Sequence, residues 1–278
     1  MKNIHFWNTL CYTDLILTVD KIFQFPHGTC CGIGQHAPCG KENLIDREYS
    51  KNSYVELEGV HMELRVDNDD GIDSWKEVIL VYNAALKQVE TKIEILNDEF
   101  QHVHRYNPIE HIKARIKTPE SIVKKLKRHG YESTIDNMVK HINDIAGIRI
   151  ICSFTSDIYR IADMLRQQRD IQVVAIKDYI TYPKASGYKS YHMIVTVPVY
   201  LSDRNVDTKV EIQIRTVAMD FWASLEHKIH YKFEGDAPEH IKSELVECAK
   251  LVSDLDIRML SLNEEILAIS QAKNSHAV

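Results

Sequence analysis

Four strand-like segments between residues 147 and 215 constrain the fold of this chain more than any other feature. They are rich in β-branched residues and bounded by turn residues, and they comprise residues 147–154, 171–177, 190–199 and 208–215. A helical segment at about 156–168 separates the first two. Strands interrupted by a helix in this way predict an α/β domain built on a mixed β-sheet.

Two helices are expected before these strands. From Trp75 to Val103, apolar residues recur every three or four positions, which is the period of one helix face. A shorter helix is predicted to begin after Thr118 as N-cap, with Pro119 as its first residue, and to end near Gly130. The strands should therefore follow a long amphipathic helix and a short capped one.

Two more helices should follow the strands, at about 216–232 and after Pro238. The last carries apolar residues from Ile241 to Ile269 at spacings of four and three. A lone helix cannot bury such a stripe, so it must pack on the first helix or on a neighbouring subunit. Because two stripes are more apolar surface than one small sheet readily covers, we expect a homo-oligomer, specifically a tetramer.

The net charge limits the possible partners. Among 278 residues, 34 Lys and Arg stand against 40 Asp and Glu, so the net charge is −6 and a polyanion needs a local basic patch. No apolar run approaches the roughly 18 residues of a membrane-spanning helix, and no signal-peptide pattern occurs. We therefore expect a cytoplasmic protein without a membrane partner.

The first quarter of the chain differs in character from the rest. Four of the six cysteines lie within the first 39 residues, but their spacing does not match the paired ligands of a zinc site. No helical or strand period is sustained there, whereas a strongly periodic helix follows Met62. Residues 1–61 are predicted to be a poorly structured extension that need not belong to the mature protein, and residues 62–278 to form the domain.

A local basic patch lies ahead of the first strand. Between Arg105 and Arg149 there are ten Lys or Arg and five Asp or Glu. In the helix after Thr118, Ser121, Lys125 and Arg128 share one face. A solvated helix face would look similar, but a hydroxyl and two cations beside a helix N-terminus suit a polyphosphate.

Two carboxylates could complement this patch. In the strand at 208–215, Val210 and Ile212 point one way while Glu211 and Gln213 point the other. Asp144 stands at the turn leading into the first strand, and two such carboxylates can hold Mg²⁺ together with substrate phosphates. An edge strand with a wet face is the alternative for the polar row.

The connection between the second and third strands is both basic and aromatic. Lysines are spaced among tyrosines through residues 177–192, namely Lys177, Tyr179, Tyr182, Lys184, Tyr188, Lys189 and Tyr191. Aromatic faces can stack on a purine while cations hold its phosphates. An exposed hairpin loop with ordinary tyrosine packing would have the same composition.

Several motifs together resemble the RelA/SpoT synthetase family. They are DIAGIRI at 144–150, KDYI with PKASGYKSYH at 177–192, VEIQIRT at 210–216 and FWASLEHKIHYK at 221–232. Their order and spacing match the family over about residues 75–270. The resemblance implies a nucleotidyltransferase-like synthetase domain flanked by long N- and C-terminal helices, close in size to the small alarmone synthetases. It also implies transfer of pyrophosphate from ATP to the 3′-hydroxyl of GTP or GDP, giving pppGpp or ppGpp and AMP.

The resemblance implies roles for individual residues. Asp144 and Glu211 match the magnesium carboxylates, and Glu211 is also placed to help deprotonate the attacking hydroxyl. Arg115 and Arg149 match arginines that flank the adenine. The ATP phosphate contacts are matched by Lys117, Ser121, Lys125 and Arg128. The positions around the acceptor nucleotide are Lys177, Lys184, Tyr188, His192 and Gln213, with Tyr188 stacking on guanine.

Two features that the sequence lacks also limit the functions that we expect. Long bifunctional relatives have a hydrolase domain with a His-Asp dipeptide, which this sequence lacks, so hydrolysis of the product is not expected. Only 46 residues follow Lys232, so a ribosome-sensing domain is not expected either.

Two other functions stay open. A non-catalytic nucleotide or single-stranded RNA binding oligomer would not need both carboxylates, which repel phosphate unless a metal bridges them. An enzyme that pyrophosphorylates an RNA end would not need the guanine-stacking loop.

Overall fold

The computed structural model describes residues 52–57, 60–65, 75–104, 106–232 and 237–275. The chain divides into two units between Glu48 and Tyr49, and all described residues belong to the second unit. The described part begins with an antiparallel hairpin of β1 (Asn52–Leu57) and β2 (Val60–Arg65). The domain boundary predicted at residue 61 falls within β2, and the cysteine-rich part of the predicted extension lies outside the described residues.

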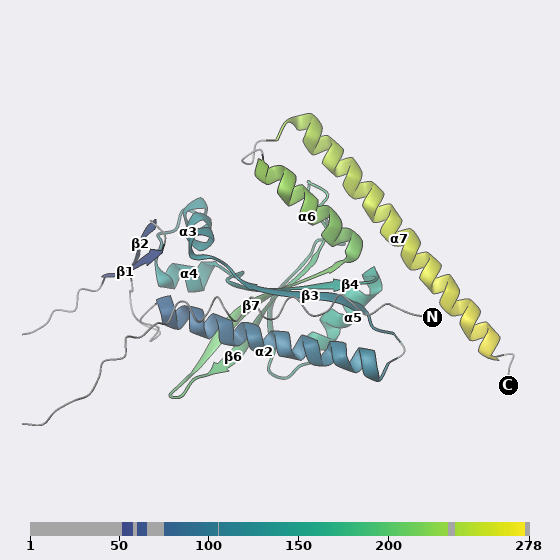
Figure 1. Ribbon diagram of the computed structural model, residues 1–278, viewed down its shortest axis with the longest axis horizontal. Helices are drawn as coiled ribbons and strands as arrows, with labels where there is room; N and C mark the ends of the chain where they lie inside the picture. Colours follow the sequence, from purple (N-terminus) through teal and green to yellow (C-terminus); the bar gives the residue numbers. More distant parts are fainter. Residues whose placement is uncertain (1–51, 58–59, 66–74, 105, 233–236, 276–278) are drawn as a thin grey trace, which may run out of the picture. The chain divides into compact units, whose positions relative to one another are not determined.

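A mixed five-stranded sheet forms the centre of the described domain (Figure 1). Its strands lie in the order β3 (Ile109–Ile116), β4 (Ala146–Cys152), β7 (Asn205–Thr216), β6 (Tyr191–Tyr200) and β5 (Gln172–Asp178). The β4–β7 pair is parallel, and the other neighbours are antiparallel. The predicted α/β class with a mixed sheet is confirmed.

One face of this sheet is buried under α2 (Trp75–His102), which lies along it in Figure 1. Val78, Ala85, Val89 and Ile93 have no exposed surface and join the sheet in a hydrophobic core. α5 (Thr155–Arg166) adds its buried face to the same core. The sheet of the same chain therefore covers the first helical stripe, so the expectation of a homo-oligomer depends on the stripe of the last helix.

The short helix α3 (Pro119–Arg128) forms as its capping residues predict. The Thr118 hydroxyl accepts a hydrogen bond from the Ser121 amide at 3.4 Å, and Gly130 follows the helix with φ 78°. Ile122 and Leu126 are buried in the core. This apolar face fixes the rotation of α3, so its basic face turns away from the core.

Besides the strands of the β1–β2 hairpin, two elements of the domain were not predicted from the sequence. β3 (Ile109–Ile116) has a charged or polar residue at alternate positions and forms an edge of the sheet, which leaves little apolar signal. α4 (Ile135–His141) has seven residues, too few to display a helical period. Both elements pack into the domain through a few residues only, such as Ile109, Ile135 and Met138.

The opposite side of the sheet carries α6 (Val217–Lys232) and α7 (Glu239–Ser275), which lie above it in Figure 1. The Trp222 indole donates a hydrogen bond to the Leu245 carbonyl at 3.0 Å, and Trp222, Ala223 and Ala249 form a small second core. α7 thus packs on α6 and α5 through its first half. The sequence left two packing partners open for this stripe, the first helix or a neighbouring subunit. The first half of α7 packs on neither of them but on α6 and α5 of the same chain.

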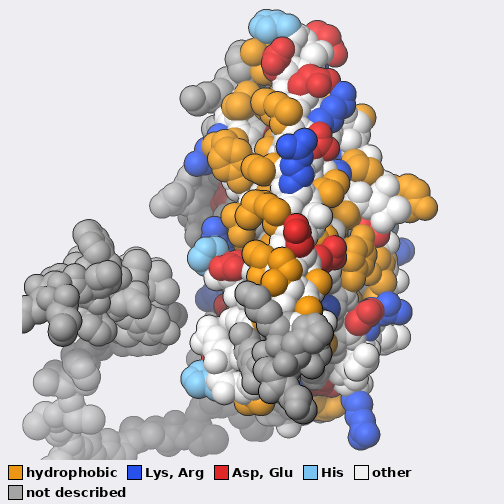
Figure 2. Space-filling view, turned by 90° about the vertical axis from the view of Figure 1, so that its right-hand side faces the viewer, with side chains coloured by type: hydrophobic (Ala, Val, Ile, Leu, Met, Phe, Trp, Pro, Cys, Tyr) orange, Lys and Arg blue, Asp and Glu red, His pale blue; other side chains and the backbone are white. Residues whose placement is uncertain are grey.

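From Leu255 onward, the apolar stripe of α7 is exposed in the described part of the chain. Leu255, Met259, Leu262, Ile266 and Ile269 are each about half exposed or more. Figure 2 shows apolar side chains following one another along this side of the molecule. None of the helices in the described ranges is long and apolar enough to cross a membrane.

We predict that Leu126→Ala lowers the free energy of unfolding by about 2–5 kcal/mol, because it leaves a cavity beneath α3. Leu126 has no exposed surface, whereas its neighbour Lys127 is exposed. Lys127→Ala is the matched control and should change the free energy of unfolding by less than about 0.5 kcal/mol. Urea denaturation measures both, and equal small effects would contradict the burial of α3.

Candidate active site

A row of polar side chains crosses the sheet, with one member from each strand. In the strand register, Lys113 pairs with Arg149, Arg149 with Gln213, Gln213 with His192, and His192 with Lys177. Residues opposite one another in neighbouring strands share a face of the sheet. The row therefore brings residues from 113 to 213 together on a single face.

This face lies opposite the one covered by α2. Ile148, Ile150, Ile212 and Ile214 alternate with the polar row along β4 and β7, and all four belong to the buried core. The strict alternation predicted for residues 208–215 is confirmed, because Glu211 and Gln213 are half-buried between fully buried neighbours. The polar residues thus face the site, and the apolar ones hold the strand in place.

A pocket of about 150 Å³ opens on the polar face over β3, β4 and β7. It is lined by Lys113, Ala114, Arg115, Asp144, Gly147, Ile148, Arg149, Glu211 and Gln213. Five of the predicted site residues are among them. Lys113 was missed, although its place two residues before Arg115 in an alternating segment is a signal that the sequence contains.

Asp144 is held by two lysines on the rim of this pocket. Lys117 Nζ donates to one carboxylate oxygen at 2.9 Å, and Lys125 Nζ donates to the other at 2.8 Å. Burial opposes ionisation of Asp144, but the hydrogen bonds and charges of the two lysines outweigh it and hold its pKa below the ordinary value. The site therefore contains an ionised carboxylate with two cations beside it.

Glu211 lies on β7 and is bonded to two neighbours in the row. His192 Nδ1 lies 3.2 Å from one carboxylate oxygen, and Gln213 Nε2 donates to the other at 2.8 Å. Since a carboxylate only accepts, Nδ1 carries the proton in this bond. Burial opposes ionisation, but the bonds from His192 and Gln213 outweigh it, so the pKa of Glu211 lies below its ordinary value. Glu211 is thus oriented and able to accept a proton.

A buried arginine links the pocket to α6. Arg215 is 4% exposed and donates to Asp220 at 3.1 Å, and Arg149 donates to the same carboxylate oxygen, also at 3.1 Å. Burial and the nearby charge of Arg215 lower the pKa of Arg149. The alternation of β7 predicts that Arg215 lies on the polar face, but its partners were not predicted because Asp220 belongs to the following helix.

Tyr188 is fixed by its hydroxyl group. Arg215 Nη2 donates to the Tyr188 oxygen at 2.5 Å, and that oxygen lies 2.9 Å from His192 Nε2, to which it can donate. The ammonium group of Lys184 lies 4.7 Å from the centroid of the Tyr188 ring and 4.8 Å from that of Tyr179. Burial and the charge of Lys177 lower the pKa of Lys184. Lys184, Tyr179 and Tyr188 of this loop thus pack together, whereas Tyr182 is exposed.

Two of the predicted ATP residues stand apart from the pocket. Ser121 and Arg128 are exposed on α3 and do not line it. They share a helix with Lys125, which reaches Asp144, so the basic face of α3 continues from the pocket rim outward. The arrangement as a whole offers two carboxylates and several cations on one surface, which suits a phosphate-rich ligand with a divalent cation.

Comparison with known proteins shows which family this chain resembles. Residues 114–236 match a family model described as a region found in RelA / SpoT proteins. The chain is 48% identical to GTP pyrophosphokinase YwaC of Bacillus subtilis over 212 residues, covering 76% of this chain and all of that protein. It is 35% identical to GTP pyrophosphokinase YjbM of the same organism over 192 residues, covering 69% of this chain and 90% of that one.

The fold of this chain also matches solved structures of similar proteins. The small alarmone synthetase 2 of Bacillus subtilis matches with a TM-score of 0.63 and 49% identity, covering 69% of this chain and 98% of that one. The small alarmone synthetase 1 of the same organism, bound to its product pppGpp, matches with a TM-score of 0.65 and 34% identity, covering 69% and 97%. Because it is 48% identical over 212 residues to a relative that is covered over its whole length, the chain belongs to the small alarmone synthetases of the RelA/SpoT family.

Proposed function

We propose that this protein is a GTP pyrophosphokinase that transfers pyrophosphate from ATP to the 3′-hydroxyl of GTP or GDP and so makes (p)ppGpp. The observation that carries the proposal is the pocket in which Asp144 and Glu211 stand among cations on one sheet face. The relatives are named GTP pyrophosphokinases, and one structural neighbour is bound to pppGpp. A protein that only binds nucleotides or RNA would not need two carboxylates there.

The ATP side of the site is proposed to be the pocket and the adjoining face of α3. Arg115 and Arg149 line the pocket and are suited to flank the adenine ring. Lys117 and Lys125 now pair with Asp144, and the phosphates of ATP would compete for the same ammonium groups. Ser121 and Arg128 would extend these contacts along the helix. A structural neighbour, the small alarmone synthetase 1, is bound to AMPCPP, which is consistent with an adenine nucleotide site.

Asp144 and Glu211 fit the donor set that Mg²⁺ prefers. Both are carboxylates that line one pocket and remain ionised, and Mg²⁺ takes one or two protein carboxylates with phosphates and water as its other ligands. We propose that these two residues hold it. Bound there, the ion would neutralise charge on the transferring phosphoryl groups. Phosphoryl transfer otherwise needs mainly positioning, which the cations of the site supply.

Glu211 is the proposed general base. Its two hydrogen bonds with His192 and Gln213 orient the carboxylate, and an ionised carboxylate can take the proton of the attacking 3′-hydroxyl. The acceptor nucleotide would then lie over the β6 and β5 side of the row, near His192 and Lys177. Guanine is proposed to stack on Tyr188, with Lys184 moving from the ring toward the acceptor phosphates.

The assembly is proposed to be a homotetramer that covers the exposed part of α7. The exposed stripe residues of α7 are Leu255, Met259, Leu262, Ile266 and Ile269, and a contiguous exposed apolar patch of this kind marks an interaction site. The apolar stripe of α2 does not favour an oligomer, because it is mostly buried within its own subunit.

We predict that light scattering of the full-length protein gives a mass of four subunits and that Leu262→Glu lowers it. Leu262 is 53% exposed on α7 and belongs to the uncovered stripe. Ser261→Glu is the control, because it adds the same charge one position away, off the stripe. A parent protein that is monomeric at micromolar concentration would contradict the assembly.

We predict that Glu211→Gln reduces (p)ppGpp synthesis by far more than it reduces ATP affinity. An amide neither holds Mg²⁺ well nor accepts a proton at neutral pH, whereas the lysines beside Asp144 remain. ATP affinity should fall about tenfold, or about 1.4 kcal/mol. The assay incubates protein with ATP, Mg²⁺ and GTP or GDP and separates products by anion exchange.

The control for this experiment is Asp207→Asn, an exposed carboxylate on the same strand. It should keep the activity of the parent. If Glu211→Gln still made alarmone at more than about one per cent of the parent rate, the residue would not be the base. If the parent itself made none, the proposed function would be wrong.

We predict that Tyr188→Ala weakens the guanine nucleotide and leaves ATP affinity nearly unchanged, because base stacking is worth about 1–3 kcal/mol. Tyr188→Phe is the matched control. It keeps the ring but loses the hydroxyl bonds with Arg215 and His192, so it should cost less. Steady-state KM values for both nucleotides measure this, and equal losses for both would contradict the stacking role.

A further inference from the structure

We propose that α7 positions the acceptor loop, here defined as residues 179–190, and thereby sets the affinity for the guanine nucleotide. Its positioning residues are Ala249 and Ser253, which contact the two neighbours of Tyr188 in the loop. The inference rests on the proposed function, because it concerns the nucleotide that Tyr188 receives.

The first contact joins Gly187 to Ala249. Gly187 has φ +88°, and a Cβ atom built on it would lie 2.5 Å from the Cβ of Ala249, 3.8 Å from the Cα of Val246 and 3.9 Å from the Trp222 ring. No real Cβ lies so close to another carbon. The loop backbone therefore touches α7 at a point where only glycine fits, both for its conformation and for its lack of a side chain.

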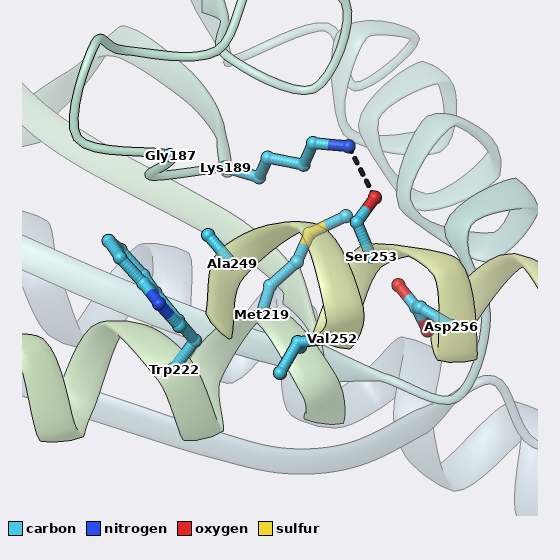
Figure 3. Close-up of a pocket in the computed structure, with 8 residues that line it drawn as sticks. All are labelled: Gly187, Lys189, Met219, Trp222, Ala249, Val252, Ser253 and Asp256. Carbon is cyan, nitrogen blue, oxygen red and sulfur yellow. Dashed lines mark hydrogen bonds between the residues drawn. The ribbon is translucent and has the colours of Figure 1, made fainter. Parts of the chain in front are cut away.

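The second contact joins Lys189 to Ser253. Lys189 Nζ donates to the Ser253 hydroxyl at 2.5 Å, as Figure 3 shows. One turn further along α7, the buried Asp256 accepts a hydrogen bond from the Thr216 hydroxyl at 2.8 Å. Since Thr216 ends β7, this bond ties α7 to the sheet that carries the active site. The helix is thus anchored independently of the loop and can hold it.

The surfaces of the loop and the helix fit closely. The space between Gly187, Lys189, α6 and α7 has a cavity volume of only about 20 Å³, which is room for about one water molecule. Figure 3 shows Trp222, Met219 and Val252 around this space. The loop and the two helices thus border the same small space.

Tyr188 lies between these two contacts and is supported from the same side. Its ring packs against the cluster of Trp222 and Ala249, and its hydroxyl is bonded to Arg215 and His192. The backbone on both sides of Tyr188 and the ring itself are therefore held by α7 or by groups of the site. None of the residues that line the ATP pocket belongs to α7. Loss of the α7 contacts should therefore affect the acceptor and spare ATP.

The first test compares Ser253→Ala with Ser261→Ala in the full-length protein. Ser261 is an exposed serine on the same helix, so the control makes the same change away from the loop. We expect Ser253→Ala to raise the KM for GDP about threefold to tenfold, as loss of one hydrogen bond would, with the KM for ATP unchanged. The control should match the parent in both values.

The second test uses steric compensation. Gly187→Ala brings the two Cβ atoms into collision, and adding Ala249→Gly removes one of them while leaving the backbone strain at residue 187. Glycine inside a helix is destabilising, so Ala249→Gly cannot restore activity simply by stabilising the protein. We expect the single Gly187→Ala variant to raise the KM for GDP about tenfold or more and the double variant to recover at least part of that loss.

The outcomes separate this inference from the proposed function. If the parent makes no alarmone, the proposed function is wrong. If the parent is active, but Ser253→Ala equals its control and Ala249→Gly rescues nothing, α7 does not position the loop. Equal rises in the KM for GDP and for ATP would also overturn the inference, since α7 would then support the domain as a whole. Thermal unfolding of each variant confirms that it is folded.

Discussion

The alternation of side chains along β7 is the constraint on which the rest of this structure depends. A strand sends successive residues to opposite faces, so Ile212 and Ile214 enter the core while Glu211 and Gln213 face the site. A shift of one residue in register would bury the carboxylate and expose the isoleucines. The core under α2 therefore fixes the position of Glu211 as firmly as it fixes the fold.

The positive charges of the site are balanced by two carboxylates, each of which pairs with two cations. Asp144 holds two lysines, and Asp220 holds two arginines. Cations gathered on one face would repel one another without these anions. Phosphates that enter such a site can take over part of the pairing. The same arrangement therefore explains both how so many cations are tolerated on one face and how they can attract a polyphosphate.

The layer of α6 and α7 adds a second support on the side of the sheet that carries the site. Trp222, Ala249 and Ser253 lie under or beside the loop that carries Tyr188, and Asp256 ties the helix back to the end of β7. Contacts in this layer are small and specific, because one glycine and one alanine allow the close approach. The exposed apolar residues of the same helix, from Leu255 onward, take no part in these contacts.

The sequence by itself determined the elements and residues whose signals are local. Local patterns and, for α3, capping residues identified α2, α3, α5, α6, α7 and four of the five strands of the sheet, and the common face of Ser121 and Lys125 was evident from their spacing. Only the tertiary structure decided which side chains meet: that α2 is covered by its own sheet, that β3 joins its edge, that Arg215 and Arg149 share Asp220, and that α7 holds Gly187. Periodicity records the direction of a side chain along one element, whereas these contacts depend on how distant elements pack, which no local pattern contains.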